Sequence, residues 1–118
     1  MSNARFMRSE RLLHSEDYRT TIAKRCRSGD QLFTVYASKR PTGGARLGIT
    51  ISRRVSTKAV RRNRLKRRIR ESFRYHKRPL AGLDLVVIAR HEANETERLQ
   101  VDQSLLGHWT RVREKCGK

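Results

Sequence analysis

The sequence predicts an α+β fold, a two-layer α/β sandwich, from three observations. Two neighbouring segments, Gln31 to Lys39 and Arg46 to Ser52, alternate apolar and polar residues in the manner of strands. A third segment, Leu83 to Arg90, is a short apolar run rich in β-branched residues, which predicts a buried strand. Helical patterns precede, separate and follow these strands, so the order is α-β-β-α-β-α around one core.

The first helix is predicted from Ser15 to about Lys24. Ser15 can cap it, and two acidic residues follow at the positive end of the helix. Tyr18 and Ile22 are four residues apart and therefore share one face. A further short strand is expected around Lys24 to Ser28.

The second helix begins after Ser56 or Thr57, either of which can cap it, and extends to about His76. It carries a narrow apolar stripe with a spacing of four residues, formed by Leu65, Ile69 and Phe73. The turn between the two alternating strands is PTGGA, from Pro41 to Ala45.

The closing helix is predicted from about Val101 to about Lys115, with Leu105, Trp109 and Val112 buried. At 118 residues, without a repeat or a low-complexity linker, the chain is expected to form a single domain over residues 1–118. Residues 1–10 and 116–118 are expected to be flexible ends.

Charge narrows the choice of partner. The chain has 29 Lys and Arg against 11 Asp and Glu, a formal net charge of +18. Such a surplus favours polyanionic partners. A membrane partner is not expected, because no apolar run approaches the roughly 20 residues that span a bilayer and the start of the chain lacks a secretory signal.

The two cysteines, Cys26 and Cys116, show no CxxC or Cys/His spacing. We therefore expect two incidental, reduced thiols in a cytoplasmic protein.

The segment from Arg53 to Arg78 contains 13 Lys or Arg and one acidic residue, Glu71. Charge around a helix is usually a solvated face, in which acids and bases alternate and form i, i+4 ion pairs. Here they do not alternate, so like charges destabilise the isolated helix. An external polyanion explains this arrangement best, and Arg suits phosphate because its planar fork binds two oxygens.

The two alternating strands have one apolar and one small, polar side. The apolar side carries Phe33, Val35 and Ala37, then Leu47, Ile49 and Ile51. The polar side carries Thr34, Tyr36 and Ser38, then Gly48, Thr50 and Ser52. Two interpretations remain open: a solvated sheet face, which is usual for antiparallel sheets, or a docking surface on which Tyr36 stacks.

Residues for catalysis by the protein itself are few. The four histidines are scattered, and no metal-ligand cluster or Gly-rich phosphate loop is present. Asp84 lies inside a strand and is interpreted as a structural hydrogen-bond partner. Ser52 and Cys26 have no evident triad partners, although a triad is a spatial arrangement.

The segment KAVRRNRLKRRIRESFR, from Lys58 to Arg74, resembles the bacterial ribonuclease P protein family. That family is marked by Arg-Asn-Arg, then Lys-Arg, then Arg-Glu and an aromatic residue. The matching residues are Arg62, Asn63, Arg64, Lys66, Arg67, Arg70, Glu71 and Phe73. RLLHSEDY, RLGITISRR and LDLVVIAR resemble flanking segments of the family, so the resemblance covers about residues 11–106.

The resemblance implies a fold like the second domain of ribosomal protein S5, with a mixed four-stranded sheet and a left-handed β-α-β crossover around the basic helix. It also implies a protein subunit of ribonuclease P that supports tRNA 5′ maturation. The implied partners are the ribonuclease P RNA and precursor tRNA, with no further protein partner required. Catalysis and its Mg²⁺ belong to the RNA subunit in that family, so neither a catalytic residue nor a metal or other cofactor is expected on the protein.

The family implies two RNA-binding surfaces. The catalytic RNA would bind Arg61, Arg62, Asn63, Arg64, Lys66, Arg67 and Arg70. The 5′ leader of precursor tRNA would bind Tyr18, Ile22, Tyr36, Thr50, Ser52 and Arg53. For Tyr18, helix-to-sheet packing remains the alternative to stacking on a base, and Asn63 remains open as a solvent-exposed polar residue.

This chain departs from the family at two places. Ile22 replaces a second aromatic residue, and Arg53-Arg54 with Ser56-Thr57 replaces a Lys-Lys and Gly-containing loop. Two other functions stay open from the residues alone: a ribosomal-type structural RNA-binding protein and a nuclease that acts without RNA.

Overall fold

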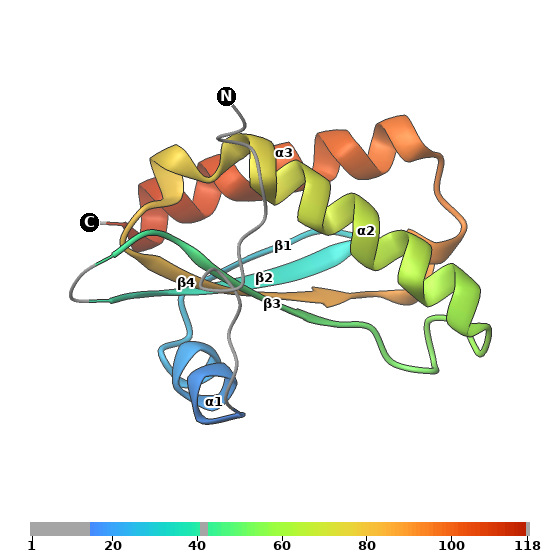
Figure 1. The fold of residues 1–118 in the computed structure, drawn as a ribbon, viewed down its shortest axis with the longest axis horizontal. Coiled ribbons are helices and arrows are strands. Elements are labelled where there is room, and N and C mark those ends of the chain that lie inside the picture. The colour runs from blue at the N-terminus through green and yellow to red at the C-terminus, as the bar shows by residue number, and fades with distance from the viewer. Residues whose placement is uncertain (1–14, 41–42, 118) are drawn as a thin grey trace.

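The computed structural model describes residues 15–40 and 43–117, which form one sheet with helices on both of its faces (Figure 1). The elements in chain order are α1 (Ser15–Ala23), β1 (Arg27–Gly29), β2 (Phe33–Lys39), β3 (Arg46–Thr50), α2 (Ala59–His76), the 3₁₀ turn η2 (Arg78–Leu80), β4 (Leu83–Ala89), the 3₁₀ turn η3 (His91–Asn94) and α3 (Arg98–Cys116). The predicted α+β fold and the order of its elements are confirmed, including the short additional strand.

The sheet is mixed, with the strand order β1-β2-β4-β3. β1 and β4 both pair with β2 in antiparallel orientation, whereas β3 pairs with β4 in parallel orientation. The parallel pair is joined by α2, because a parallel connection needs a crossover. β4 lies between two strands and six of its seven residues are buried, as its continuous apolar run predicted.

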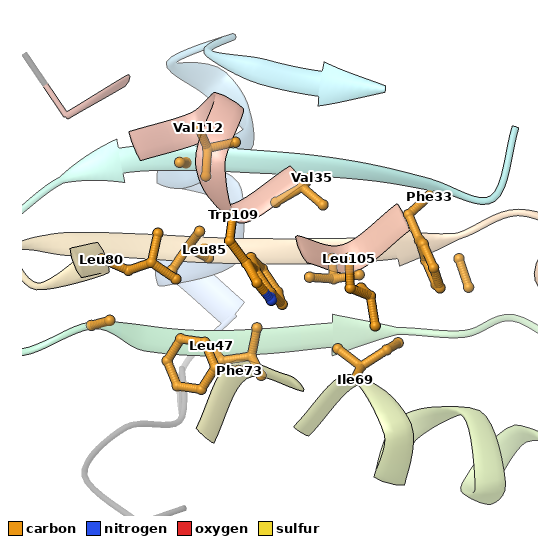
Figure 2. Packing of buried hydrophobic residues seen from close by; sticks show 14 of the residues in the cluster. Phe33, Val35, Leu47, Ile69, Phe73, Leu80, Leu85, Leu105, Trp109 and Val112 are labelled. Carbon is orange, nitrogen blue, oxygen red and sulfur yellow. The ribbon is translucent and has the colours of Figure 1, made fainter. Parts of the chain in front are cut away.

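The hydrophobic core lies between the sheet and the helices α2 and α3 (Figure 2). Leu65, Ile69 and Phe73 face this core, so the predicted apolar stripe is confirmed. The rings of Phe73 and Trp109 meet edge to face with centroids 6.0 Å apart. Trp109 Nε1 also donates a hydrogen bond to Ser72 Oγ at 2.8 Å, so the buried indole keeps a polar partner.

Helix α1 lies on the opposite face of the sheet from α2 and α3 (Figure 1). It contacts β2 and β4. Thr21 is the fully buried residue of α1, and its Oγ1 accepts a hydrogen bond from Ser38 Oγ of β2 at 3.3 Å. The polar side of the strands is therefore partly covered, and the two-layer sandwich gains a short third layer over part of that side.

Two predicted helix starts are wrong. α2 begins at Ala59 with Lys58 as its N-cap, and no side chain caps it. Ser56 Oγ instead accepts a hydrogen bond from the backbone N–H of Lys58, so it closes a local turn before the helix. α3 begins at Arg98 rather than Val101, because the backbone carbonyl of Glu97 already accepts the first helical hydrogen bond, from Val101.

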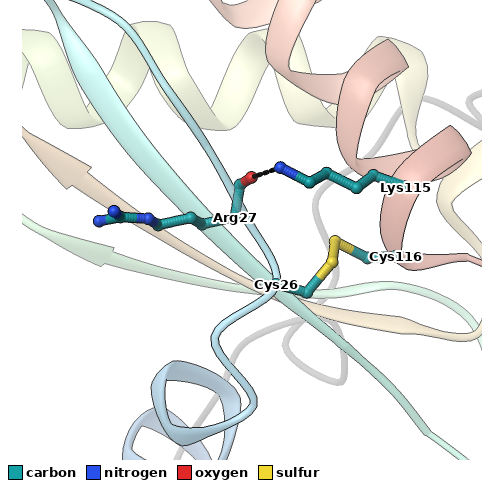
Figure 3. The surroundings of a disulfide bond; sticks show 4 residues. All are labelled: Cys26, Arg27, Lys115 and Cys116. Carbon is teal, nitrogen blue, oxygen red and sulfur yellow. Dashed lines mark hydrogen bonds between the residues drawn. A yellow bond between two sulfur atoms is a disulfide. The ribbon is translucent and has the colours of Figure 1, made fainter.

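The expectation of two free thiols is wrong, and Cys116, which was expected in a flexible end, is held at the end of α3. Cys26 and Cys116 form a disulfide, with Cα atoms 5.8 Å apart (Figure 3). Cys26 directly precedes β1, and Cys116 is the last residue of α3, which packs on β1. The sequence separation of 90 residues concealed this proximity. The other expected flexible end, residues 1–10, lies outside the described residues.

No helix in the described part of the chain is both long enough and apolar enough to span a membrane.

Candidate nucleic-acid interface

One side of α2 is buried and the other carries cations. Since Ile69 is fully buried, helical geometry places Asn63, Arg67 and Arg70 on the side turned away from the core, and all three are exposed. Arg61 and Arg64 are exposed beside them. Eight residues of α2 are Lys or Arg, against the single acid Glu71.

These cations lack acidic partners. Within residues 15–40 and 43–117, none of the arginines Arg61, Arg64, Arg67 and Arg70 lies within 4.0 Å of a carboxylate oxygen. Glu71 is directed to Arg74, at 3.4 Å, and to Arg98, at 3.9 Å. The outward side of α2 is therefore a concentration of uncompensated positive charge, suited to a polyanion.

Two predicted residues of this helix are less exposed than the others. Arg62 is half-buried, and its Nη1 donates a hydrogen bond to the backbone carbonyl of Ser56 at 2.8 Å. It therefore fixes the turn that leads into α2. Lys66 is also half-buried. Of the seven residues predicted to bind the catalytic RNA, Arg61, Asn63, Arg64, Arg67 and Arg70 form the exposed set, which we call the α2 ridge.

The second surface is the polar side of the sheet. In the strand ladders Tyr36 lies opposite Val86, and Val86 opposite Gly48, so these residues form one rung. Two residues further along each strand, Thr34, Ile88 and Thr50 form the next rung on the same side of the sheet. Tyr36 and Thr34 are half-buried and Thr50 is exposed, so this side of the sheet is open to a ligand there.

Tyr18 lies directly on this surface. A Cβ atom at Gly48 would come within 2.6 Å of Tyr18 Cζ, so the ring rests on the bare backbone of β3. Glycine at position 48 is required for this close approach. The packing interpretation of Tyr18 is therefore supported, and its half-buried ring also forms one border of the open rungs.

A charged network holds α1 in place beside the open rungs. Arg46 donates two hydrogen bonds to Asp84, from Nε and Nη2, each at 2.7 Å. The same Nη2 lies 3.5 Å from Asp17 Oδ1 on α1. The hydrogen bond to Asp84 raises the pKa of Arg46, and burial only partly opposes it. Asp84 is thus the structural hydrogen-bond partner that the sequence predicted.

The remaining predicted leader residues lie close to these two surfaces. Ile22 is half-buried on α1, one turn beyond Tyr18. Ser52 and Arg53 are exposed in the turn between β3 and α2. The structure therefore brings Tyr18, Tyr36 and Thr50 to one side of the sheet, with Ser52 and Arg53 between that side and the basic helix.

A serine, a histidine and an aspartate also form a line, between β1 and α3. His108 Nδ1 lies 2.8 Å from Ser28 Oγ, and Nε2 lies 3.1 Å from Asp30 Oδ2. However, His108 is fully buried and Ser28 is 6% exposed, and Arg111 Nε donates to Ser28 Oγ at 2.7 Å. The hydroxyl is thus enclosed by packing partners, and the line connects α3 to the sheet edge.

Burial lowers the pKa of His108, and the neighbouring Asp30 only partly opposes this effect. Burial also tends to raise the pKa of Asp30, but hydrogen bonds from Ser104 and from the backbone of Phe33 and Leu32 outweigh it and lower that pKa to about 2. A neutral imidazole beside a charged carboxylate requires the proton on Nε2.

Among the described residues, no group of three or more His, Cys, Asp or Glu side chains could hold a metal ion.

Sequence reasoning missed a second group of cations, at the edge of the sheet formed by β1. A cavity of about 550 Å³ there is lined by Arg27, Arg90, Arg111 and Lys115 together with Ser28, Gly29 and Thr34. The spacing of four residues between Arg111 and Lys115 was a signal that they share one face of a helix. Their proximity to Arg27 depends on packing between distant segments.

Known proteins are similar to this chain over most of its length. A family model described as Ribonuclease P matches residues 6–113. The ribonuclease P protein component of Marinomonas sp. (strain MWYL1) is 38% identical over 116 residues, which cover 96% of this chain and 86% of the relative. That of Methylococcus capsulatus is 38% identical over 111 residues, 94% of this chain and 87% of the relative.

Solved structures agree with this match. The RNase P protein of Staphylococcus aureus superposes with a TM-score of 0.81 at 32% identity, covering 87% of this chain and 94% of that protein. The RNase P protein of Thermotoga maritima gives a TM-score of 0.78 at 33% identity, covering 87% and 97%. Both the fold and the sequence match extend over most of each protein, and the chain therefore belongs to the bacterial ribonuclease P protein component family, whose members are subunits of the RNase P endoribonuclease.

Proposed function

We propose that this chain binds the catalytic RNA of ribonuclease P through the α2 ridge and the 5′ leader of precursor tRNA across the polar side of its sheet. The observation that carries the proposal is the outward side of α2, on which exposed arginines have no carboxylate within 4.0 Å among the described residues. Phosphates supply the missing counter-charge, and each Arg can bind two phosphate oxygens.

Within the α2 ridge, the arginines and Asn63 have different tasks in this proposal. Arg64, Arg67 and Arg70 neutralise phosphates, which supplies affinity and register without reading sequence. Asn63 lies on the same side of the helix and offers an amide donor and acceptor to a sugar or base edge. Arg62 supports them indirectly, because its hydrogen bond to the Ser56 carbonyl fixes the turn at which α2 begins.

The leader binds where the sheet is open. Tyr36 offers one face for stacking, which tolerates any base and so suits leaders of varied sequence. Thr50 and Ser52 are exposed hydroxyls that can bind sugar or phosphate groups, and Arg53 is an exposed cation at the same border. Tyr18 and Ile22 form the wall on the side of α1, where Tyr18 is held over Gly48.

In this function the protein positions and screens its two RNA partners, and the RNA subunit with its Mg²⁺ cleaves the phosphodiester. No residue of the chain is assigned to the chemistry of cleavage. The ordered match over residues 6–113 is with the ribonuclease P family, so a ribosomal-type role is not favoured.

The test uses the enzyme reconstituted from this protein and ribonuclease P RNA. Tyr36→Ala should weaken binding of precursor tRNA by about 1–3 kcal/mol if the ring stacks on a leader base. Tyr75→Ala removes a tyrosine that is 65% exposed on α2, outside both proposed surfaces, and should leave the affinity unchanged.

Mature tRNA serves as the second ligand because it lacks the leader. Its affinity should be the same for the parent enzyme and for Tyr36→Ala. Equal losses for precursor and mature tRNA would assign Tyr36 to folding rather than to the leader. Cleavage of precursor tRNA in Mg²⁺ by the protein without RNA would contradict the assignment of catalysis to the RNA subunit.

A further inference from the structure

The cavity lies at the β1 edge of the sheet, whereas the basic helix α2 contacts the β3 edge. Its cationic walls are Arg27 on β1, Arg90 after β4, and Arg111 and Lys115 on α3. The strand order puts β1 and β3 at opposite edges of the sheet, and α2 contacts β3 whereas α3 contacts β1 and β2. The cavity is therefore separate from the α2 ridge.

Three of these cations are fixed by neutral oxygen atoms. Lys115 Nζ donates to the backbone carbonyl of Arg27 at 3.0 Å (Figure 3). Arg111 Nε donates to Ser28 Oγ at 2.7 Å, and Arg90 Nη1 donates to the backbone carbonyl of Asp30 at 2.9 Å. A neutral acceptor orients a cation and leaves its charge uncompensated, so these groups remain available to an anion.

Acidic groups do not compensate them. In the part of the chain that the structure describes, no carboxylate oxygen lies within 4.0 Å of Arg27, Arg90, Arg111 or Lys115. Asp30 follows the cavity residue Gly29, and its carboxylate accepts hydrogen bonds from Ser104 Oγ at 2.6 Å and from the backbone N–H of Leu32 and Phe33. Its charge is thus directed to its own turn and to α3.

The two main walls of the cavity are covalently joined. Cys26 immediately precedes Arg27, and Cys116 immediately follows Lys115, so the disulfide fastens the strand to the helix next to both cations (Figure 3). A site whose walls are fixed before binding loses less conformational freedom when a ligand arrives. The cavity is consequently pre-organised for an anion.

The cavity is also continuous with the open side of the sheet. Arg27 lies directly opposite Tyr36 in the ladder between β1 and β2, and Gly29 lies opposite Thr34. Residues paired in this way share a face of the sheet, with Cβ atoms about 5 Å apart. Thr34 itself lines the cavity. An RNA strand that stacks on Tyr36 therefore leaves the sheet beside Arg27.

We infer that this cavity binds phosphates of single-stranded RNA, namely those of the precursor leader upstream of the nucleotides that contact Tyr36. The inference rests on the proposed function: if α2 holds the catalytic RNA near the β3 edge, the cleavage end of the leader enters there. The strand then crosses β4 and β2, and its upstream end reaches β1. Arginine forks and an ammonium bind phosphates of any sequence, so the contact extends leader affinity without adding sequence preference.

The experiment measures the affinity of the reconstituted enzyme for precursors whose leaders are shortened one nucleotide at a time. The variant Arg27→Gln/Lys115→Gln removes two exposed cations of the cavity and keeps Arg111, which is bonded to Ser28. The control Lys39→Gln/Arg113→Gln removes the same charge elsewhere. Lys39 ends β2 at the pair with Leu83, and Arg113 lies beside Pro79 in a separate small cavity.

For the longest leaders, the cavity variant should bind about threefold to thirtyfold more weakly than the control, and its log–log salt slope should fall by roughly 1 to 1.5. For the shortest leaders and for mature tRNA, the two variants should bind equally. The leader length at which affinity stops rising should be shorter in the cavity variant.

Three results overturn the inference. Equal affinities of cavity variant and control at every leader length mean that the cations act only through net charge. A loss that is the same for all leaders and for mature tRNA means that the cavity binds the RNA subunit or the tRNA body. A precursor with a long DNA leader is a further ligand. If the cavity variant loses affinity for the long DNA leader but not for the long RNA leader, the cavity has no RNA-binding role. Failure of the parent protein to assemble with ribonuclease P RNA contradicts the proposed function itself and is seen before any leader is added.

Discussion

The two long helices α2 and α3 lie on the same face of the sheet and bury comparable apolar stripes, but they use the rest of their surfaces differently. α2 carries eight Lys or Arg residues against one acid, and its outward side is exposed. α3 carries four against two, buries His108 in polar contacts and ends in a disulfide. α3 thus has additional buried and covalent contacts, whereas exposed charge is concentrated on α2.

This difference separates two kinds of substitution. Changes to the buried residues of α3 should lower the free energy of unfolding, because these residues connect distant parts of the chain. Changes on the outward side of α2 should weaken RNA binding and leave the fold intact, because nothing in the described fold depends on those side chains. Substitutions on the two helices therefore test this division.

Trp109→Ala should lower the free energy of unfolding by about 3–5 kcal/mol. The indole is 3% exposed, and the substitution removes its edge-to-face contact with Phe73 and leaves Ser72 Oγ without its donor. Urea unfolding measures the loss. Tyr75→Ala on α2 should change stability by less than about 0.5 kcal/mol, as expected for an exposed residue; similar losses for both variants would contradict the division between the helices.

Opening the disulfide should lower the free energy of unfolding by about 2–4 kcal/mol. The bond between Cys26 and Cys116 closes a loop of 90 residues, and its loss frees the unfolded chain. Urea melts with and without a reductant measure the effect. The double variant Cys26→Ser/Cys116→Ser is the control, because reductant should not change its midpoint. If reductant leaves the midpoint of the parent unchanged as well, the bond contributes nothing to stability.

Acidification should weaken the contact between α3 and the β1 edge through His108. Burial lowers the pKa of His108 in the folded protein below the ordinary value of 6.5, so the unfolded chain binds its proton more readily. This contribution to stability is complete above pH 6.5 and is lost as the pH falls below it. Asp30 contributes in a second window: its stabilisation is complete above pH 3.8 and is lost toward pH 2.

Urea melts between pH 8 and pH 5, in roughly unit steps, can isolate the histidine contribution. His108→Gln should abolish the decline below pH 6.5, whereas the exposed His91→Gln should retain it. An identical decline in all three proteins would assign the pH dependence to other groups.

The sequence predicted the elements whose pattern is local. The alternation from Gln31 to Lys39, the stripe of Leu65, Ile69 and Phe73, and the apolar run around β4 were each sufficient to place an element and its buried side. The family resemblance supplied the mixed sheet, which local patterns do not specify, because pairing between β3 and β4 is a contact between distant segments.

What the sequence did not predict depends on distant or directional contacts. Cys26 and Cys116 meet only because α3 returns to the β1 edge, and the same return brings Arg111 and Lys115 to Arg27. Arg62 has the composition of a phosphate ligand, but its guanidinium turns back to the Ser56 carbonyl. Tyr18 has the composition of a stacking residue, but only the structure reveals that its ring rests on Gly48.

The central claim is that the α2 ridge binds RNA phosphates, and the salt dependence of its affinity for ribonuclease P RNA tests this most directly. Arg64→Ala/Arg67→Ala/Arg70→Ala removes three exposed ridge cations. Lys24→Ala/Lys39→Ala/Arg113→Ala removes three exposed cations elsewhere and keeps the net charge equal. The ridge variant should lower the log–log slope by roughly 2–3, with its urea midpoint maintained, and the control should keep the parent slope. A ridge variant with the slope of the parent, or a control with the same reduction, would contradict the claim.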